Sequence, residues 1–154
     1  MEFVASNIII KELKYDDSFK DFIELPFELY KDDSAWVPPL KSDFKKYIKG
    51  ENNYLNQSGE NTKVVAYKDN KPVGRLLVGI NEHLNKVKGA NEGYISLFEC
   101  AQDYNVAFSL LEFAENWLII RGISLIKGPL SLPGGDDNRG FLIGLGCQKT
   151  PLNY

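Results

Sequence analysis

Short runs of β-branched and aromatic residues, bounded by polar turns, predict five β-strands along the chain. They occupy residues 7–13, 63–68, 73–80, 92–99 and 124–127. The Asp69-Asn70 pair between the second and third runs is typical of a hairpin turn. In the fourth run, strict alternation predicts that Ser96 and Phe98 lie on one face of the sheet and Leu97 on the other.

Apolar residues at helical spacing predict helices over residues 19–30, 41–49 and 104–121. Pro26 interrupts the first, which predicts a kink or a division into two short helices. Asp103 and Gly122 are suited to cap the start and the end of the third. The polar stretches 50–61 and 81–91 show no period and are predicted to be loops. The third helix lies between the strands predicted over residues 92–99 and 124–127, and this order predicts a crossover that joins two parallel strands.

Composition places the chain among globular proteins of a single domain. It has 154 residues, of which 44% are hydrophobic and 25% charged, and its formal net charge is -3. An acidic balance argues against a nucleic-acid-binding protein, which usually has a basic face. The apolar runs are shorter than the roughly 20 residues that cross a bilayer. With no signal peptide apparent, we expect a cytoplasmic protein that binds neither nucleic acid nor membrane.

A local cluster of lysines departs from the acidic average. Lys41, Lys45, Lys46 and Lys49 lie close together in the second predicted helix. The favoured interpretation is a solvated helix face, and the alternative is a local basic patch.

The cysteines and the histidine of the sequence give little support for a metal site or for a catalytic cysteine. Cys100 and Cys147 lack the spacing of a zinc site, and His83 is the single histidine, so we expect no metal. Cys100 is a candidate nucleophile only if folding brings His83 beside it. A buried, inert thiol is the favoured interpretation.

The composition changes after Gly128-Pro129, and residues 128–154 form a glycine-rich tail that is predicted to be irregular. Its most polar part, residues 134–140, contains Arg139. A surface turn is the favoured interpretation, and a loop that binds an anion through Arg139 is the alternative.

Five separated segments resemble a bacterial family related to the GNAT (N-acetyltransferase) superfamily. They are residues 22–30, with a Leu-Pro-Phe-Glu-Leu-Tyr sequence; 36–40, Trp-Val-Pro-Pro-Leu; 72–75, Pro-Val-Gly-Arg; 117–122, Trp-Leu followed by Arg-Gly; and 127–129, Lys-Gly-Pro. The resemblance implies an α/β (α+β) fold, in which helices flank a mixed sheet. It also implies transfer of an acyl group from acetyl-CoA or another acyl-CoA to an amine.

The resemblance assigns roles to residues around the end of the fourth strand. Glu99 is the best available general base, acting on the amine directly or through water. The alternative is an exposed carboxylate at a strand end. Leu97 and Phe98, together with the helix start at Tyr104 and Asn105, are implied to form the acyl-CoA side of the site.

Two departures from the family pattern qualify this hypothesis. GNAT enzymes usually bind the CoA pyrophosphate with a glycine-containing loop at the start of the main helix, but residues 100–107 contain no glycine. Asp103 also places a negative charge there. The GNAT fold further implies a helix and two strands after the fifth strand, and we expect this sequence to lack them.

These departures leave a second hypothesis from another class. The chain is then a non-catalytic GNAT-like binding or dimerisation module with a degenerate CoA site. An incomplete sheet exposes an edge that a second copy can cover, which predicts a homodimer. Light scattering tests this prediction, and a monomer at working concentration would contradict it.

Overall fold

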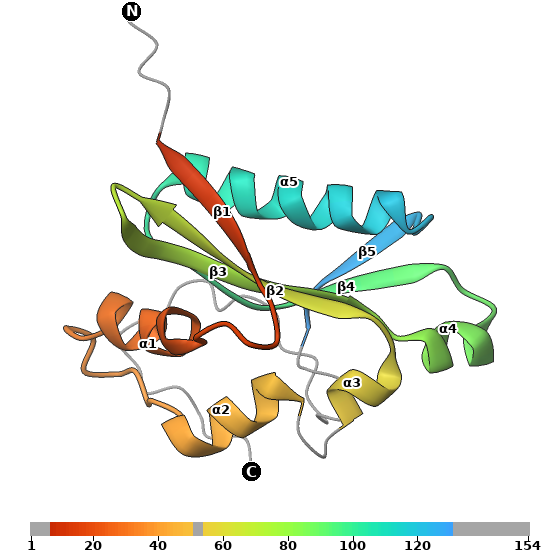
Figure 1. Cartoon of the computed structure of the whole chain (residues 1–154), viewed down its shortest axis with the longest axis horizontal. Coiled ribbons are helices and arrows are strands. Elements are labelled where there is room, and N and C mark those ends of the chain that lie inside the picture. The colour runs from red at the N-terminus through yellow and green to blue at the C-terminus, as the bar shows by residue number, and fades with distance from the viewer. Residues whose placement is uncertain (1–6, 51–53, 131–154) are drawn as a thin grey trace, which may run out of the picture.

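A computed structural model describes residues 7–50 and 54–130. They form a five-stranded sheet whose strands lie side by side in chain order, as Figure 1 shows. The strands are β1 (Ile8–Leu13), β2 (Asn61–Lys68), β3 (Lys71–Ile80), β4 (Glu92–Cys100) and β5 (Leu125–Leu130). Neighbours from β1 to β4 are antiparallel, whereas β5 is parallel to β4. The predicted mixed sheet is confirmed.

Helices cover both faces of this sheet (Figure 1). α5 (Tyr104–Ile120) lies on one face, and α1 (Lys20–Leu29) lies on the other with α2 (Lys41–Lys49) packed against it. Two short helices, α3 (Tyr54–Ser58) and α4 (Glu82–Lys88), lie in the connections between strands. This arrangement confirms the predicted α+β class.

The sheet is buried on both faces because successive side chains of its central strands point in opposite directions. The core on the α5 side includes Val64, Leu76, Val106, Leu110 and Leu118. The core on the α1 side includes Leu13, Phe22, Ile23, Ile48 and Val65. The second core fixes α1 against the middle of the sheet.

α5 begins where the sequence predicts. A side-chain oxygen of Asp103 accepts a hydrogen bond from the Asn105 amide at 2.9 Å, which satisfies one of the free amides at the helix start. The helix ends at Ile120, and Gly122 follows with a φ of 73°, a conformation that favours glycine. The chain then enters β5, which confirms the parallel crossover.

α1 is one continuous helix with Pro26 inside it, so the predicted division into two helices is wrong. Proline has no amide hydrogen and leaves the carbonyl four residues earlier without its helical partner. That carbonyl belongs to Phe22, and it accepts a hydrogen bond from Nη1 of Arg75 on β3. A donor from the sheet therefore replaces the bond that Pro26 removes.

The predicted loops at residues 50–61 and 81–91 contain α3 and α4, so both predictions are wrong in part. α4 buries none of its residues and for this reason has no apolar period. The residues that cap α4 are the features of the sequence that indicate it. Asn81 Oδ1 accepts a hydrogen bond from the Leu84 amide at 2.9 Å, and Gly89 has a φ of 62°. The tail residues 131–154, with Arg139 and Cys147, lie outside the described residues.

Replacing Lys63 by methionine is expected to stabilise the protein by about 1–2 kcal/mol at pH 7. Lys63 is only 8% exposed, and burial lowers its pKa to about 8. A lysine with a lowered folded-state pKa binds fewer protons folded than unfolded, so stability rises as pH rises from about 8 towards the unfolded-state value. Urea unfolding should show the advantage of the variant at pH 7 and its decline by about pH 10. An equal advantage at both pH values would contradict the burial of a charged lysine.

Candidate functional site

A β-bulge interrupts β4 near its carboxyl end. Ser96 pairs with Leu77 of β3, and Glu99 pairs with Arg75. Two residues of β4, Leu97 and Phe98, therefore lie opposite a single residue of β3. Leu97 has a φ of 53°, a left-handed conformation that is rare for a residue with a branched aliphatic side chain. The bulge is thus a local departure from regular sheet, at a position where such departures are often functional.

The bulge also changes which face of the sheet each side chain occupies. Ile95, before the bulge, belongs to the core on the α5 side, and Phe98 of the bulge and Cys100 beyond it pack against that core. Leu97 packs against the core on the α1 side, and Glu99 reaches Tyr30 from α1. Ser96 and Phe98 therefore do not share a face, and the predicted strict alternation is wrong.

Glu99 is half-buried and bound by a tyrosine. The phenol of Tyr30, the C-cap residue that follows α1, donates a hydrogen bond to Glu99 Oε2. Oε1 of Glu99 accepts no hydrogen bond from the described part of the chain. The exposed-carboxylate alternative is therefore wrong, and one oxygen is left for another donor.

An aromatic cluster holds Tyr30 in place. The ring of Trp36 lies 5.4 Å from that of Tyr30 and 5.2 Å, edge to face, from that of Phe27. Burial, together with the hydrogen bond to Glu99, raises the pKa of Tyr30 above its usual range. The phenol therefore remains a hydrogen-bond donor at neutral pH.

Arg75 of β3 pairs with Glu99 in the sheet and carries a positive charge. It is 4% exposed, and its guanidinium lies 4.9 Å from the centre of the Phe22 ring and 5.1 Å from that of Phe44. Burial lowers the pKa of Arg75 to about 10, and the negative charge of Glu99 opposes that shift. The arginine is charged at neutral pH and attracts the Glu99 carboxylate across the β3–β4 pair.

The acid at the start of α5, Asp103, forms an ion pair with a lysine. Asp103 Oδ2 lies 2.5 Å from the ammonium of Lys68, and this contact lowers the pKa of the Asp103 carboxyl. The next residues, Tyr104 and Asn105, are exposed on the first turn of the helix. The cap thus occupies one helix amide, while Lys68 brings a cation to the same end.

The other candidate residues do not form a second site. Cys100 is half-buried, its Sγ lies 3.9 Å from the carbonyl of Asp103, and burial raises the pKa of its thiol. His83 lies exposed on α4, and within the described residues no hydrogen bond joins it to Cys100. Within residues 7–50 and 54–130, no cluster of three histidine, cysteine or acidic residues could hold a metal. In the same part of the chain, no helix is long and apolar enough to span a membrane.

The sequence reasoning found Glu99 but missed its partners, Tyr30 and Arg75. Of the residues assigned to acyl-CoA, Leu97 and Phe98 form the bulge, while Tyr104 and Asn105 lie at the start of the next element. Their roles stay predictions. An arginine inside the apolar β3 run and a proline inside a helix were the signals that could have led to Arg75.

Comparison with curated proteins finds two distant relatives. The chain is 29% identical over 128 residues to Protein YghO of Escherichia coli (strain K12), with 80% of this chain and 32% of that protein covered. It is 26% identical over 135 residues to a bacterial ceramide synthase of Caulobacter vibrioides, with 86% and 35% covered. The chain thus spans about a third of the length of these relatives. No family model matches the sequence.

Comparison with solved structures finds acetyltransferases. Aminoglycoside N-acetyltransferase AAC(6')-Iy in complex with CoA superposes with a TM-score of 0.58 at 14% identity, covering 94% of this chain and 97% of that one. A predicted acetyltransferase with acetyl-CoA from Clostridium acetobutylicum gives 0.55 at 15% identity, with 84% of each chain covered. An aminoglycoside acetyltransferase from an uncultured soil metagenomic sample gives 0.54 at 19%, covering 79% and 76%. The fold is that of the GNAT acetyltransferases.

Proposed function

We propose that this chain is an acyl-CoA-dependent N-acyltransferase domain in which Glu99 is the general base. The observation that carries the proposal is the Glu99 carboxylate, held by Tyr30 next to the bulge of β4, with Oε1 accepting no hydrogen bond from residues 7–50 and 54–130. The GNAT fold supports it, because solved structures of this fold include complexes with CoA and acetyl-CoA.

In the proposed reaction, Glu99 accepts a proton from the ammonium group of the acceptor. The neutral amine then attacks the thioester carbonyl, a C–N bond forms, and the C–S bond breaks. The CoA thiolate leaves and takes up the second proton that the nitrogen loses on becoming an amide, and Glu99 returns its own proton to solvent. Tyr30 keeps Glu99 oriented, and the bulge at Leu97 and Phe98 is the proposed place of the thioester.

The acceptor class follows from chemistry and from one relative. A base that takes a proton from an ammonium group suits a primary amine. One curated relative is a bacterial ceramide synthase, and ceramides are N-acylated long-chain amino alcohols. We therefore place sphinganine among the amines to be tested, beside short polyamines and amino sugars.

Ligand binding separates the enzyme from the non-catalytic module. CoA, acetyl-CoA or palmitoyl-CoA at 100 times its dissociation constant should stabilise the fold by about 2.7 kcal/mol, measured by thermal shift and calorimetry. Release of free CoA thiol with an amine from the panel then establishes transfer. If neither CoA, acetyl-CoA nor palmitoyl-CoA binds at millimolar concentration, the acyltransferase proposal fails and the non-catalytic binding module is favoured. The homodimer stays a prediction for light scattering.

Replacing Asp103 by asparagine is expected to tighten CoA binding by about fivefold, the effect of one unit charge near the surface. Asparagine caps a helix as well as aspartate does, so α5 should keep its start. The change removes a negative charge and frees Lys68 to meet a phosphate. Calorimetry with CoA measures the effect, and the Asp69→Asn variant controls for net charge. Unchanged or weaker binding would show that the pyrophosphate lies away from this helix end.

A further inference from the structure

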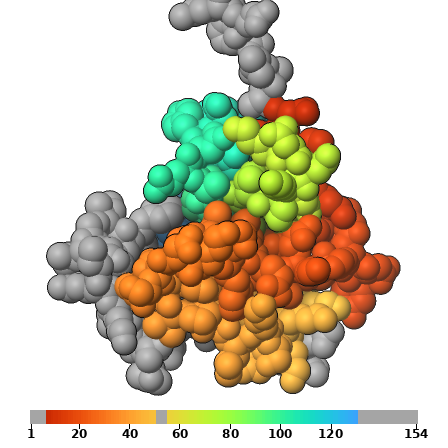
Figure 2. Space-filling view, turned by 90° about the vertical axis from the view of Figure 1, so that its left-hand side faces the viewer, coloured from red at the N-terminus to blue at the C-terminus, as the bar shows by residue number. Residues whose placement is uncertain are grey.

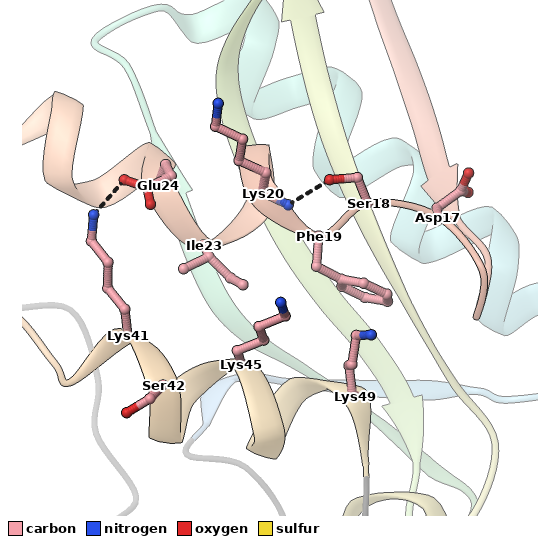
Figure 3. Close-up of a pocket in the computed structure, with 10 residues that line it drawn as sticks. All are labelled: Asp17, Ser18, Phe19, Lys20, Ile23, Glu24, Lys41, Ser42, Lys45 and Lys49. Atoms are coloured by element: carbon pink, nitrogen blue, oxygen red, sulfur yellow. Dashed lines mark hydrogen bonds and ion pairs between the residues drawn. The ribbon is translucent and has the colours of Figure 1, made fainter.

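A groove of about 410 Å³ runs between α1 and α2, away from the Glu99 site. Figure 2 shows the face of the molecule on which these two helices lie together, and Figure 3 shows the groove itself. Its lining residues are Asp17, Ser18, Phe19, Lys20, Ile23, Glu24, Lys41, Ser42, Lys45 and Lys49. Glu99, Tyr30 and Arg75 are absent from this lining. The volume lies within the range of small-molecule sites.

One wall of the groove is a row of lysines. Lys41, Lys45 and Lys49 follow one another at four-residue spacing on α2, so they lie on one stripe of the helix. Lys20 also lines the groove, but Figure 3 shows its ammonium group pointing away from α2, and the lining contains two carboxylates, Asp17 and Glu24. The groove is therefore positive in a chain whose net charge is -3, and it attracts anions.

The lysines differ in what they already bind. Lys41 lies 2.6 Å from Glu24 and above the ring of Phe27, so its charge is matched. Lys49 lies 5.9 Å from the centre of the Phe19 ring. Lys45 forms no ion pair within the described part of the chain, and Figure 3 shows its side chain reaching from α2 towards α1. Lys45 and Lys49 are thus the cations left for a ligand.

The opposite wall has an apolar part next to the charged Glu24. Phe19 and Ile23 of the α1 segment line the groove across from the lysines, as Figure 3 shows. Both side chains are 6% exposed and belong to the core on the α1 side. Apolar side chains that face ammonium groups suit a ligand with an alkyl part and an anionic head.

We propose that the α1–α2 groove binds an amphipathic anion, with its carboxylate or phosphate on Lys45 and Lys49 and its alkyl part against Phe19 and Ile23. The site is separate from the proposed acyl-transfer site and does not depend on it. Such an anion is either a free molecule or the headgroup of a lipid in a surface. We commit to the free molecule, because the groove has walls on two sides.

The test uses decyl phosphate and decanoate below their micellar concentrations, with inorganic phosphate and decanol as probes that lack one part each. Calorimetry should show binding of the two amphiphiles, and much weaker binding of phosphate or decanol. The Lys45→Gln/Lys49→Gln variant should weaken binding of decyl phosphate at least about tenfold. Lys46→Gln is the matched control, because Lys46 lies on the same helix outside the groove, and it should change the affinity less than about twofold.

A second variant separates the groove from a charged surface. Ile23→Ala shortens the apolar side chain that faces α2 in Figure 3 without changing charge, and it should weaken binding of decyl phosphate more than binding of inorganic phosphate. Equal weakening by Lys46→Gln, or full binding of decyl phosphate by Ile23→Ala, would overturn the proposal. So would an absence of binding at millimolar amphiphile. Binding to phosphatidylglycerol vesicles without binding to free decyl phosphate would also overturn it and would indicate a lipid surface.

Discussion

Replacing Glu99 by glutamine is expected to lower kcat/KM for N-acyl transfer by about 10²–10⁴-fold, the usual contribution of a general base. Glutamine has the same shape, and its amide oxygen can accept the hydrogen bond of Tyr30, so the fold should be retained. The loss follows because the amide cannot take a proton from the ammonium group. Release of CoA thiol, measured with the best amine of the panel, gives the rate.

The pH profile makes this prediction specific. Without the base, the rate should depend on the fraction of acceptor that is already neutral, so activity of the variant should recover as pH approaches the pKa of the amine. Glu28→Gln is the control, because Glu28 is an exposed acid on α1 that pairs with Lys31. A Glu99→Gln variant that keeps its activity within about threefold would remove Glu99 from the mechanism.

The largest expected effect on stability comes from Arg75. Replacing it by alanine should lower the free energy of unfolding by about 3–5 kcal/mol, because the change opens a cavity and leaves the Phe22 carbonyl without a donor. Replacing it by methionine fills most of the volume, while the Phe22 carbonyl again lacks its donor, so it should cost less than alanine by the contribution of the cavity. Urea unfolding measures both variants. Equal losses would show that the guanidinium itself stabilises the core.

Pro26 offers a sharper test of the same contact. In a Pro26→Ala background, α1 gains an amide that can bond the Phe22 carbonyl within the helix. The loss caused by Arg75→Ala should then be smaller by about 1–2 kcal/mol, measured as the coupling in a double-mutant cycle. Additive losses would contradict the compensation between the two residues.

The elements that the sequence predicted well are those with strong local patterns. α5 has an apolar stripe, a capping aspartate and a following glycine, all of which are visible in a short window. α4 lies exposed and buries nothing, so hydrophobic spacing carried no information about it. The five strands were found because β-branched and aromatic residues dominate them.

The site was harder to predict because its contacts are not local. Tyr30 and Glu99 are 69 residues apart in the chain, and Arg75 lies 53 residues from Phe22. The period of apolar residues shows which face of a helix or strand a residue occupies. It does not show which residues of another element that residue contacts. A proline inside a helix and an arginine inside a buried strand each break a local rule, and such exceptions often compensate one another.

The bulge at Leu97 and Phe98 has a consequence for comparing this chain with its relatives. Every residue of β4 beyond the bulge is transposed to the opposite face, so the position of Glu99 depends on the number of residues before it as well as on its identity. A relative with the same three-residue step from Ser96 to its glutamate but no bulge would turn that glutamate towards α5, away from the tyrosine. A relative with one residue fewer and a regular strand would keep its glutamate on the α1 side, opposite the β3 position of Arg75. An alignment without a gap here can therefore match two glutamates that point in opposite directions, and a one-residue gap is needed where the bulge is not shared.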